Sequence, residues 1–241
     1  MILQINQTAA NGKNEFEITE NGQLLFKASA PFYKPTTPVG GDVFRRLTLT
    51  DINGDLLLCT DYNAAENLAA SSLPLSWLFK DSKQVRRYSV TDGSGQVIGR
   101  FYYEQSGVAD TKLVIEHSDR LFVCYRKEAG KKEVVSFYDG DTQIGQLTKP
   151  NCVTDNLDSY LVHFIDGIFD KKISLFVVYY DFLYHNHSGE IAKGRRANMT
   201  YTFDKNSKKY NKGFIAEQFG DDENRRVEQF IKDAYGTRKK S

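Results

Sequence analysis

The sequence ISLFVVYYDFLY, residues 173–184, is the longest apolar stretch of the chain. It is shorter than the ~20 residues that a membrane-spanning helix needs, and Asp181 interrupts it. Its apolar residues would fall on every face of a helix, which is typical of a helix buried inside a protein. A buried strand would also suit its β-branched and aromatic residues, but its length favours the helix.

Four hairpin patterns precede this stretch, and each consists of two β-favouring segments around a polar turn. The clearest are VTDGSGQVIGRFYY at 90–103 and FYDGDTQIGQLTKP at 137–150, and the others lie at 18–28 and 49–62. Asn-Gly and Asp-Gly pairs supply the positive φ that tight hairpin turns need, at 21–22, 53–54, 92–93 and 139–140. The uneven spacing of these turns argues against a solenoid and favours a meandering antiparallel sheet. A sheet with so many strands has to cover or eliminate its edges, and closure into a barrel does so.

A second helix is predicted at 221–235, DDENRRVEQFIKDAY. Val227, Phe230, Ile231 and Ala234 share one face of this helix, which is the pattern of an amphipathic helix that packs on a protein surface. The acidic residues at its start suit the positive end of the helix dipole.

The composition is that of an ordinary globular protein. Hydrophobic residues make up 40% and aromatic residues 13% of 241 residues, which excludes disorder as the main state. The net charge of +1 gives no overall footprint for nucleic acid or membranes. The three cysteines, Cys59, Cys124 and Cys152, have no metal-binding or redox spacing, and no secretory signal pattern opens the sequence. We therefore expect a cytoplasmic protein with reduced thiols. A peripheral position at a membrane surface is compatible with this location.

The hairpins and the apolar stretch together resemble the tubby C-terminal-like superfamily, which includes phospholipid scramblases, plant LURP-one-related proteins and bacterial members. The resemblance rests on VTDGSGQVIGR at 90–100, FYDGDTQIGQL at 137–147 and the predicted helix at 173–184, and it covers roughly residues 15–187. It implies a mainly β (α+β) fold, namely a closed antiparallel β-barrel around a buried hydrophobic helix. The chain departs from the scramblases in the residues that follow this helix, which form a C-terminal helical extension. The basic residues that contact phosphoinositides in tubby domains do not align with particular residues here.

Two regions are expected on this basis. Residues 1–187 would form the tubby-like barrel with its central helix near 173–184. Residues 188–241 would form a basic loop and the amphipathic C-terminal helix.

Basic pairs are the candidate ligand-binding residues. If several of them shared one end of the barrel, they would bind phosphate headgroups, and each near-surface basic residue would contribute ~1 kcal/mol. The alternative is a solvated surface with acidic neighbours. The candidates are Arg45, Arg46, Arg86, Arg87, Lys131, Lys132, Arg195 and Arg196.

Asp181, His185 and His187 form a candidate metal site. Asp181 and His185 are one helical turn apart, so both would reach one metal ion, whereas His187 would have to curl back. The alternative is that both histidines cap the end of the helix or face water, because His is favourable near a helix C-terminus. No nucleophile signature accompanies them.

The function that we expect is that of a non-enzymatic binding module without a cofactor, which recognises an anionic lipid headgroup or another ligand on the barrel surface. The lipid version comes from the resemblance alone. The alternatives are a protein–protein adaptor that acts through an insertion at 63–79 or through the C-terminal extension, and a metal-dependent enzyme. The expected partner is thus an anionic membrane surface or a protein, and not nucleic acid.

Overall fold

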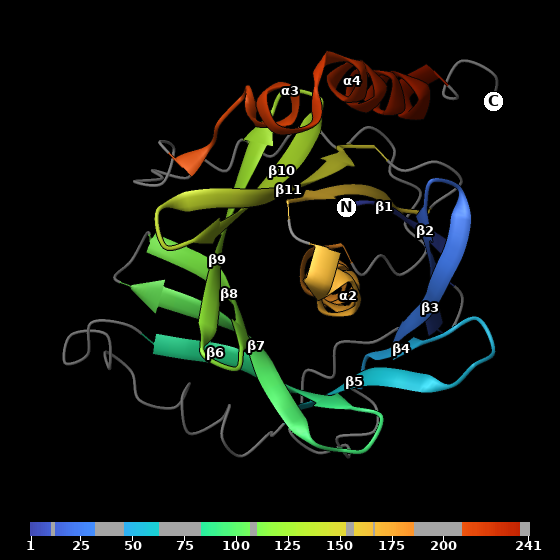
Figure 1. The fold of residues 1–241 in the computed structure, drawn as a ribbon, viewed down its shortest axis with the longest axis vertical. Coiled ribbons are helices and arrows are strands. Elements are labelled where there is room, and N and C mark those ends of the chain that lie inside the picture. Colours follow the sequence, from blue (N-terminus) through green and yellow to red (C-terminus); the bar gives the residue numbers. More distant parts are fainter. Residues whose placement is uncertain are drawn as a thin grey trace.

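A computed structural model describes residues 1–10, 13–31, 46–62, 83–106, 110–152, 157–165, 167–185 and 209–236. The insertion predicted at 63–79 lies outside these residues. Within them, twelve antiparallel strands form a closed barrel (Figure 1). Each strand pairs with its neighbours in the sequence, and β1 pairs with β12 to close the ring. The mainly β class and the closed antiparallel barrel are therefore confirmed.

The strands follow one another around the wall, joined in sequence by connections that alternate between the two ends of the barrel. Their bounds are β1 Ile2–Ala10, β2 Lys13–Glu20, β3 Gln23–Pro31, β4 Thr48–Thr50, β5 Leu56–Tyr62, β6 Lys83–Asp92, β7 Val97–Ser106, β8 Asp110–His117, β9 Arg120–Ala129, β10 Lys132–Asp139, β11 Thr142–Pro150 and β12 Ser159–Phe164.

The hairpin turns are built by aspartates and glycines. Asp51 Oδ1 accepts hydrogen bonds from the backbone N–H groups of Asn53 and Asp55, and Asp92 Oδ1 accepts the corresponding bonds in the turn between β6 and β7. In that second turn the positive φ lies at Gly95 and not in the Asp92-Gly93 pair, because Asp92 closes a loop that is longer than a two-residue turn.

The Ile-Gly step that the two clearest hairpins share has a steric cause. A Cβ atom on Gly99 would lie 2.0 Å from the carbonyl oxygen of Glu116 and 2.7 Å from Lys172 Nζ. A Cβ atom on Gly145 would lie 2.4 Å from the ring of Phe164. Both glycines therefore allow a close approach across the wall that no other residue would permit.

The apolar stretch forms the helix α2, Asp170–Tyr184, which follows the short 3₁₀ turn η3, Gly167–Phe169. Every residue from Lys172 to Leu183 is buried, and Figure 1 shows α2 within the ring of strands. The Phe176 ring meets the rings of Phe101 and Phe137 edge to face, with centroids 5.5 and 5.6 Å apart. The inward residues of the strands and those of α2 thus belong to one hydrophobic cluster.

The two ends of the barrel differ in what α2 places there. Lys172, in the first turn of α2, donates to the carbonyl oxygen of Ile98 near the start of β7. His185, directly after α2, contacts Glu133 near the start of β10. We call the end where α2 terminates the distal end; β9 ends there and β10 begins there.

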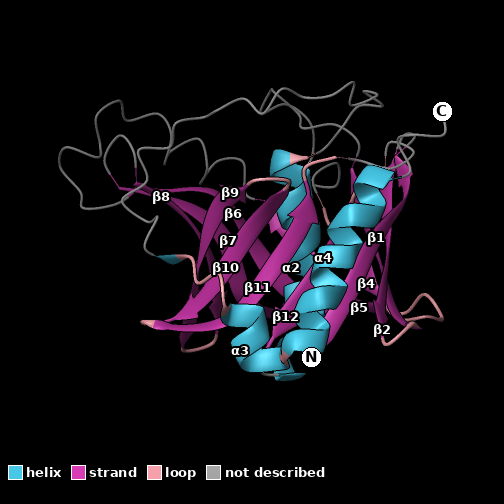
Figure 2. Ribbon diagram, turned by 90° about the horizontal axis from the view of Figure 1, so that it is seen from above, coloured by secondary structure: helices cyan, strands magenta, loops and turns pink. Residues whose placement is uncertain are grey.

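The C-terminal helices, α3 Phe214–Phe219 and α4 Asp221–Gly236, lie on the outside of the barrel (Figures 1 and 2). They contact the wall through a second, smaller cluster of Leu161, Phe214, Ile215 and Val227. The expected helix at 221–235 is confirmed, and Val227 and Ile231 of its predicted apolar face are buried. None of the helices in the described part of the chain is long and apolar enough to cross a membrane.

Candidate functional site

The basic residues predicted to bind a ligand lie toward the distal end where they are described. Arg46 precedes β4, Arg86 and Arg87 lie in the first half of β6, and Lys131 and Lys132 lie at the turn from β9 to β10. Arg45, Arg195 and Arg196 lie outside the described residues. The structure therefore brings two of the four predicted pairs, and Arg46 of a third, to the same end, at separate points of the rim.

Several of these cations already have protein partners. Arg46 forms an ion pair with Asp61 at 2.6 Å, and both side chains are about half exposed. Lys131 lies over the Tyr235 ring of α4, with its Nζ atom 5.1 Å from the ring centre. Burial lowers the pKa of Lys132, although Glu228 acts in the opposite direction. An exposed ion pair such as Arg46–Asp61 is worth about 0–1 kcal/mol, so Arg46 can exchange its partner at small cost.

Arg126, which the sequence did not single out, also lies toward the distal end, near the end of β9. Its guanidinium group lies over the Tyr184 ring, 4.6 Å from the centre, and that of Arg86 lies over the Tyr103 ring at 5.9 Å. Burial raises the pKa of Tyr184 to about 12, while Arg126 and Arg86 both favour the phenolate and act in the opposite direction. Arg86, Tyr103, Arg126 and Tyr184 thus form one group at the distal end, which we call the mouth cluster.

Glu133 holds Arg126 in place from inside the barrel. Its side chain is only 4% exposed and accepts hydrogen bonds from Arg126 Nε at 2.8 Å and from the Tyr180 hydroxyl, and it pairs with His185 Nε2 at 2.8 Å. Burial alone would raise the pKa of Glu133, but His185 and Arg126 outweigh it and hold the pKa well below its ordinary value. The Glu133 carboxylate therefore remains charged and ties the end of α2 to the wall.

A second buried pair lies beside this network. Lys149 Nζ lies 2.6 Å from Asp158 Oδ1, and their side chains are 4% and 0% exposed. Lys149 also lies over the Tyr160 ring at 5.9 Å, and the Tyr160 hydroxyl donates to Asp181 Oδ1 at 2.5 Å. Buried charges are tolerated only when they are paired in this way, so these residues form a polar core beneath the distal end.

Two of the three residues predicted to bind a metal belong to this polar core. Asp181 accepts a hydrogen bond from the Tyr160 hydroxyl, and His185 contacts Glu133. His187 lies outside the described residues. No group of three metal-binding side chains occurs within the described ranges. Asp181 and His185 therefore have defined protein contacts, and the metal site stays a prediction.

His163 and Cys152 lie beneath α4. His163 is fully buried, its Nε2 atom lies 2.8 Å from Glu223 Oε1, and its ring meets that of Phe219. Burial lowers the pKa of His163, against the opposing effect of Glu223. The Cys152 thiol donates to the carbonyl oxygen of Ala234 at 3.3 Å. Both residues thus help to seat α4 on the barrel.

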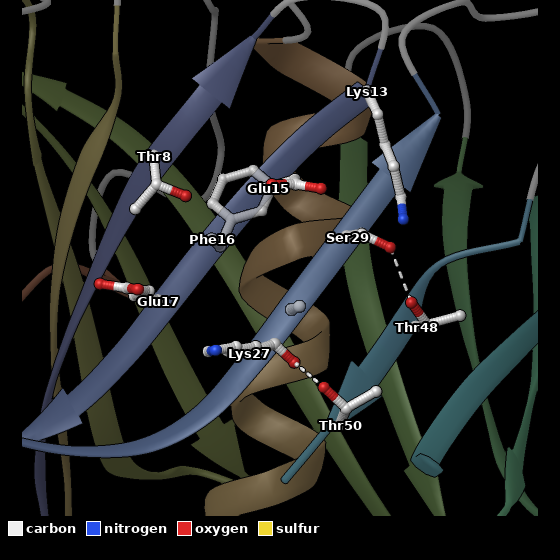
Figure 3. Close-up of a pocket in the computed structure, with 10 residues that line it drawn as sticks. Thr8, Lys13, Glu15, Phe16, Glu17, Lys27, Ser29, Thr48 and Thr50 are labelled. Carbon is white, nitrogen blue, oxygen red and sulfur yellow. Dashed lines mark hydrogen bonds between the residues drawn. The ribbon is translucent and has the colours of Figure 1, made fainter. Parts of the chain in front are cut away.

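A separate hollow of about 290 Å³ lies on the outer wall over β2, β3 and β4 (Figure 3). Its lining is polar apart from Phe16 and Ala28, and we call it the outer hollow. The lining residues are Thr8, Lys13, Glu15, Phe16, Glu17, Lys27, Ala28, Ser29, Thr48 and Thr50. No sequence motif marked these residues, because apart from the core residues Phe16 and Ala28 they are the outward residues of ordinary alternating strands.

No protein-family model, curated protein or solved structure matches the chain. The side chains of the mouth cluster and of the outer hollow are therefore the basis for a functional proposal.

Proposed function

We propose that this chain is a non-enzymatic binding module of tubby-like architecture, a barrel around a central helix, that recognises an anionic headgroup at its distal end. The burial of α2 from Lys172 to Leu183 supports the architecture. The proposed site is the mouth cluster together with the basic residues on the rim around it.

The observation that carries the proposal is that the guanidinium groups of Arg86 and Arg126 each lie over a tyrosine ring at the distal end. Arg126 keeps 36% of its side chain exposed although it is bound to Glu133. Arg86 is exposed, and its guanidinium group lies over the Tyr103 ring. Guanidinium groups bind phosphate oxygens in a planar, bidentate manner, and stacking on tyrosine rings orients them without consuming their charge.

The rim would add sequence-distant cations to this site. Arg46, Arg87, Lys131 and Lys132 lie toward the same end, and each near-surface cation adds ~1 kcal/mol to binding at an anionic membrane. The Arg46–Asp61 pair would open at little cost when a phosphate approaches.

Vesicle flotation tests this proposal. We expect the protein to float with vesicles of phosphatidylcholine that contain phosphatidylserine, to stay behind with pure phosphatidylcholine, and to lose binding as salt rises. Arg86→Gln should lower the partition coefficient about fivefold, which corresponds to the loss of ~1 kcal/mol.

Arg225→Gln is the matched control, because Arg225 is an exposed arginine on α4 that pairs with Asp222 away from the distal end. It should bind like the unchanged protein. Absence of binding to anionic vesicles, or an equal loss in both variants, would show that the distal end is not a headgroup site.

A further inference from the structure

The outer hollow lies on a different part of the wall from the mouth cluster. The pairing of β2, β3 and β4 places its outward residues in two rows across the strands. Glu15, Ser29 and Thr48 are directly opposite one another in the first row, and Glu17, Lys27 and Thr50 in the second. Directly opposite residues on one face of a sheet are close neighbours, so each row forms a continuous band.

The shape of the hollow follows from the lengths of these side chains. Ser29 and Thr48 are short and form its floor, and their hydroxyl oxygens are 2.7 Å apart. Lys13, Glu15 and Glu17, which also line the hollow, have longer side chains (Figure 3). The volume of about 290 Å³ is just below the range for small-molecule sites, roughly 300–1,000 Å³.

The hydrogen-bonding groups of the floor remain partly available. One of the two hydroxyls of Ser29 and Thr48 donates to the other, so the accepting residue keeps its own hydrogen for a ligand. The Thr50 hydroxyl donates to the carbonyl oxygen of Lys27 at 3.4 Å and keeps its lone pairs. The floor therefore offers donors and acceptors side by side.

The charged side chains that line the outer hollow are equal in number of each sign. Lys13 and Lys27 contribute two ammonium groups, and Glu15 and Glu17 two carboxylates. Glu17 and Lys27 are directly opposite, yet no ion pair joins any of these four side chains within the described part of the chain. Both kinds of charged group are therefore available to a ligand, and neither sign dominates.

Two ligand classes fit this lining poorly. An anion would meet the carboxylates of Glu15 and Glu17 as well as the lysines. A nucleobase or another aromatic ligand would need a ring face for stacking, but Phe16 is only 1% exposed.

We propose that the outer hollow is a binding site for a neutral carbohydrate. Each sugar hydroxyl both donates and accepts a hydrogen bond, and it therefore matches carboxylate, ammonium and hydroxyl groups at once. A zwitterion would pair with the lysines and glutamates of the outer hollow but leave the hydroxyls of its floor unused. The open shape leaves much of a ligand in water, so we expect millimolar affinity.

Titration of isotope-labelled protein with maltose, cellobiose and lactose, followed by amide NMR, tests this site. We expect at least one disaccharide to shift the amide signals of residues 13–17, 27–29 and 48–50 in a saturable manner. Ser29→Ala and Glu17→Gln should each weaken that binding about two- to tenfold, the effect of one hydrogen bond. The dispersion of the amide signals shows in the same spectra that each variant is folded.

Glu20→Gln is the matched control, since Glu20 belongs to the same strand but does not line the hollow. It should leave the affinity unchanged. If glycine shifts these signals and the sugars do not, the site binds zwitterions and the proposal is wrong. It is also wrong if none of the sugars shifts them or if Glu20→Gln weakens binding as much as Glu17→Gln. Vesicle binding at the distal end is independent of each of these outcomes.

Discussion

Replacement of Glu133 by glutamine should destabilise the barrel substantially. The buried carboxylate accepts hydrogen bonds from Arg126 Nε and the Tyr180 hydroxyl and pairs with His185 Nε2. Glutamine keeps the shape but removes the charge, and its amide group faces donors. Loss of one partner of a buried charged pair costs about 3–5 kcal/mol.

The exposure of Arg126 places the expected cost at the lower end of that range. Its side chain is 36% exposed, so its guanidinium group can turn toward water once Glu133 is neutral. We therefore expect a loss of about 3 kcal/mol. In a chain of this length 1 kcal/mol lowers Tm by about 2–4 °C, so thermal unfolding should show a fall of roughly 6–12 °C.

Glu128→Gln provides the control, because Glu128 lies directly opposite Glu133 on β9 and is exposed. Its Tm should change by less than about 2 °C. The pKa of Glu133 is lowered on folding, so its contribution is present above the unfolded value of about 4.3 and is lost as pH falls further. The difference between Glu133→Gln and the unchanged protein should therefore shrink in acid. A Tm difference between Glu133→Gln and the unchanged protein of less than about 2 °C at pH 7 would refute the reasoning, and so would a difference that does not shrink in acid.

Two further predictions concern the histidines and the core. Burial lowers the pKa values of His117, His163 and His185, so the unfolded chain binds more protons just below the ordinary value of about 6.5. The urea concentration at the midpoint of unfolding should therefore decrease as the pH is lowered from 7.5 to 5.5. An increase of the midpoint over this range would contradict the lowered pKa values. Phe176→Asp should abolish cooperative unfolding, because its side chain is 0% exposed and a charge there has neither water nor a partner. Phe176→Leu should retain it, and an unchanged Tm in the Asp variant would show that α2 is not in the core.

The sequence predicts the wall better than the site. The Asp-Gly and Asn-Gly turns, the apolar helix and the amphipathic helix each carry a local signal that depends on a few neighbouring residues. The closure of the barrel depends on pairing between β1 and β12, which are distant in sequence and have no signature that names their partner. The Ile-Gly step is visible in the sequence, but its cause lies across the sheet at Glu116 and Phe164.

The ion pair of Arg126 and Glu133, beside the mouth cluster, does correspond to a pattern in the sequence. Phe122 and Cys124 are buried inward residues of β9, and Arg126 continues their alternation. Glu133 stands in the same phase as Val135 and Phe137 on the neighbouring strand β10. Opposite charges in the inward phase of adjacent strands predict a buried ion pair. The basic pairs were more conspicuous in the sequence, but adjacent residues of a strand face opposite sides.

The pairing of β1 with β12 has a consequence for biosynthesis. The amino group of Met1 donates to the carbonyl oxygen of Phe164, and Leu3 lies opposite Val162. At about 5–20 residues per second, a ribosome needs roughly 8–30 s to make the intervening chain. The first strand emerges with one of its edges lacking a partner, and α2 is translated only after all twelve strands. The nascent sheet must therefore stay open until α2 has been translated and can pack inside it. A chaperone would matter most during this interval.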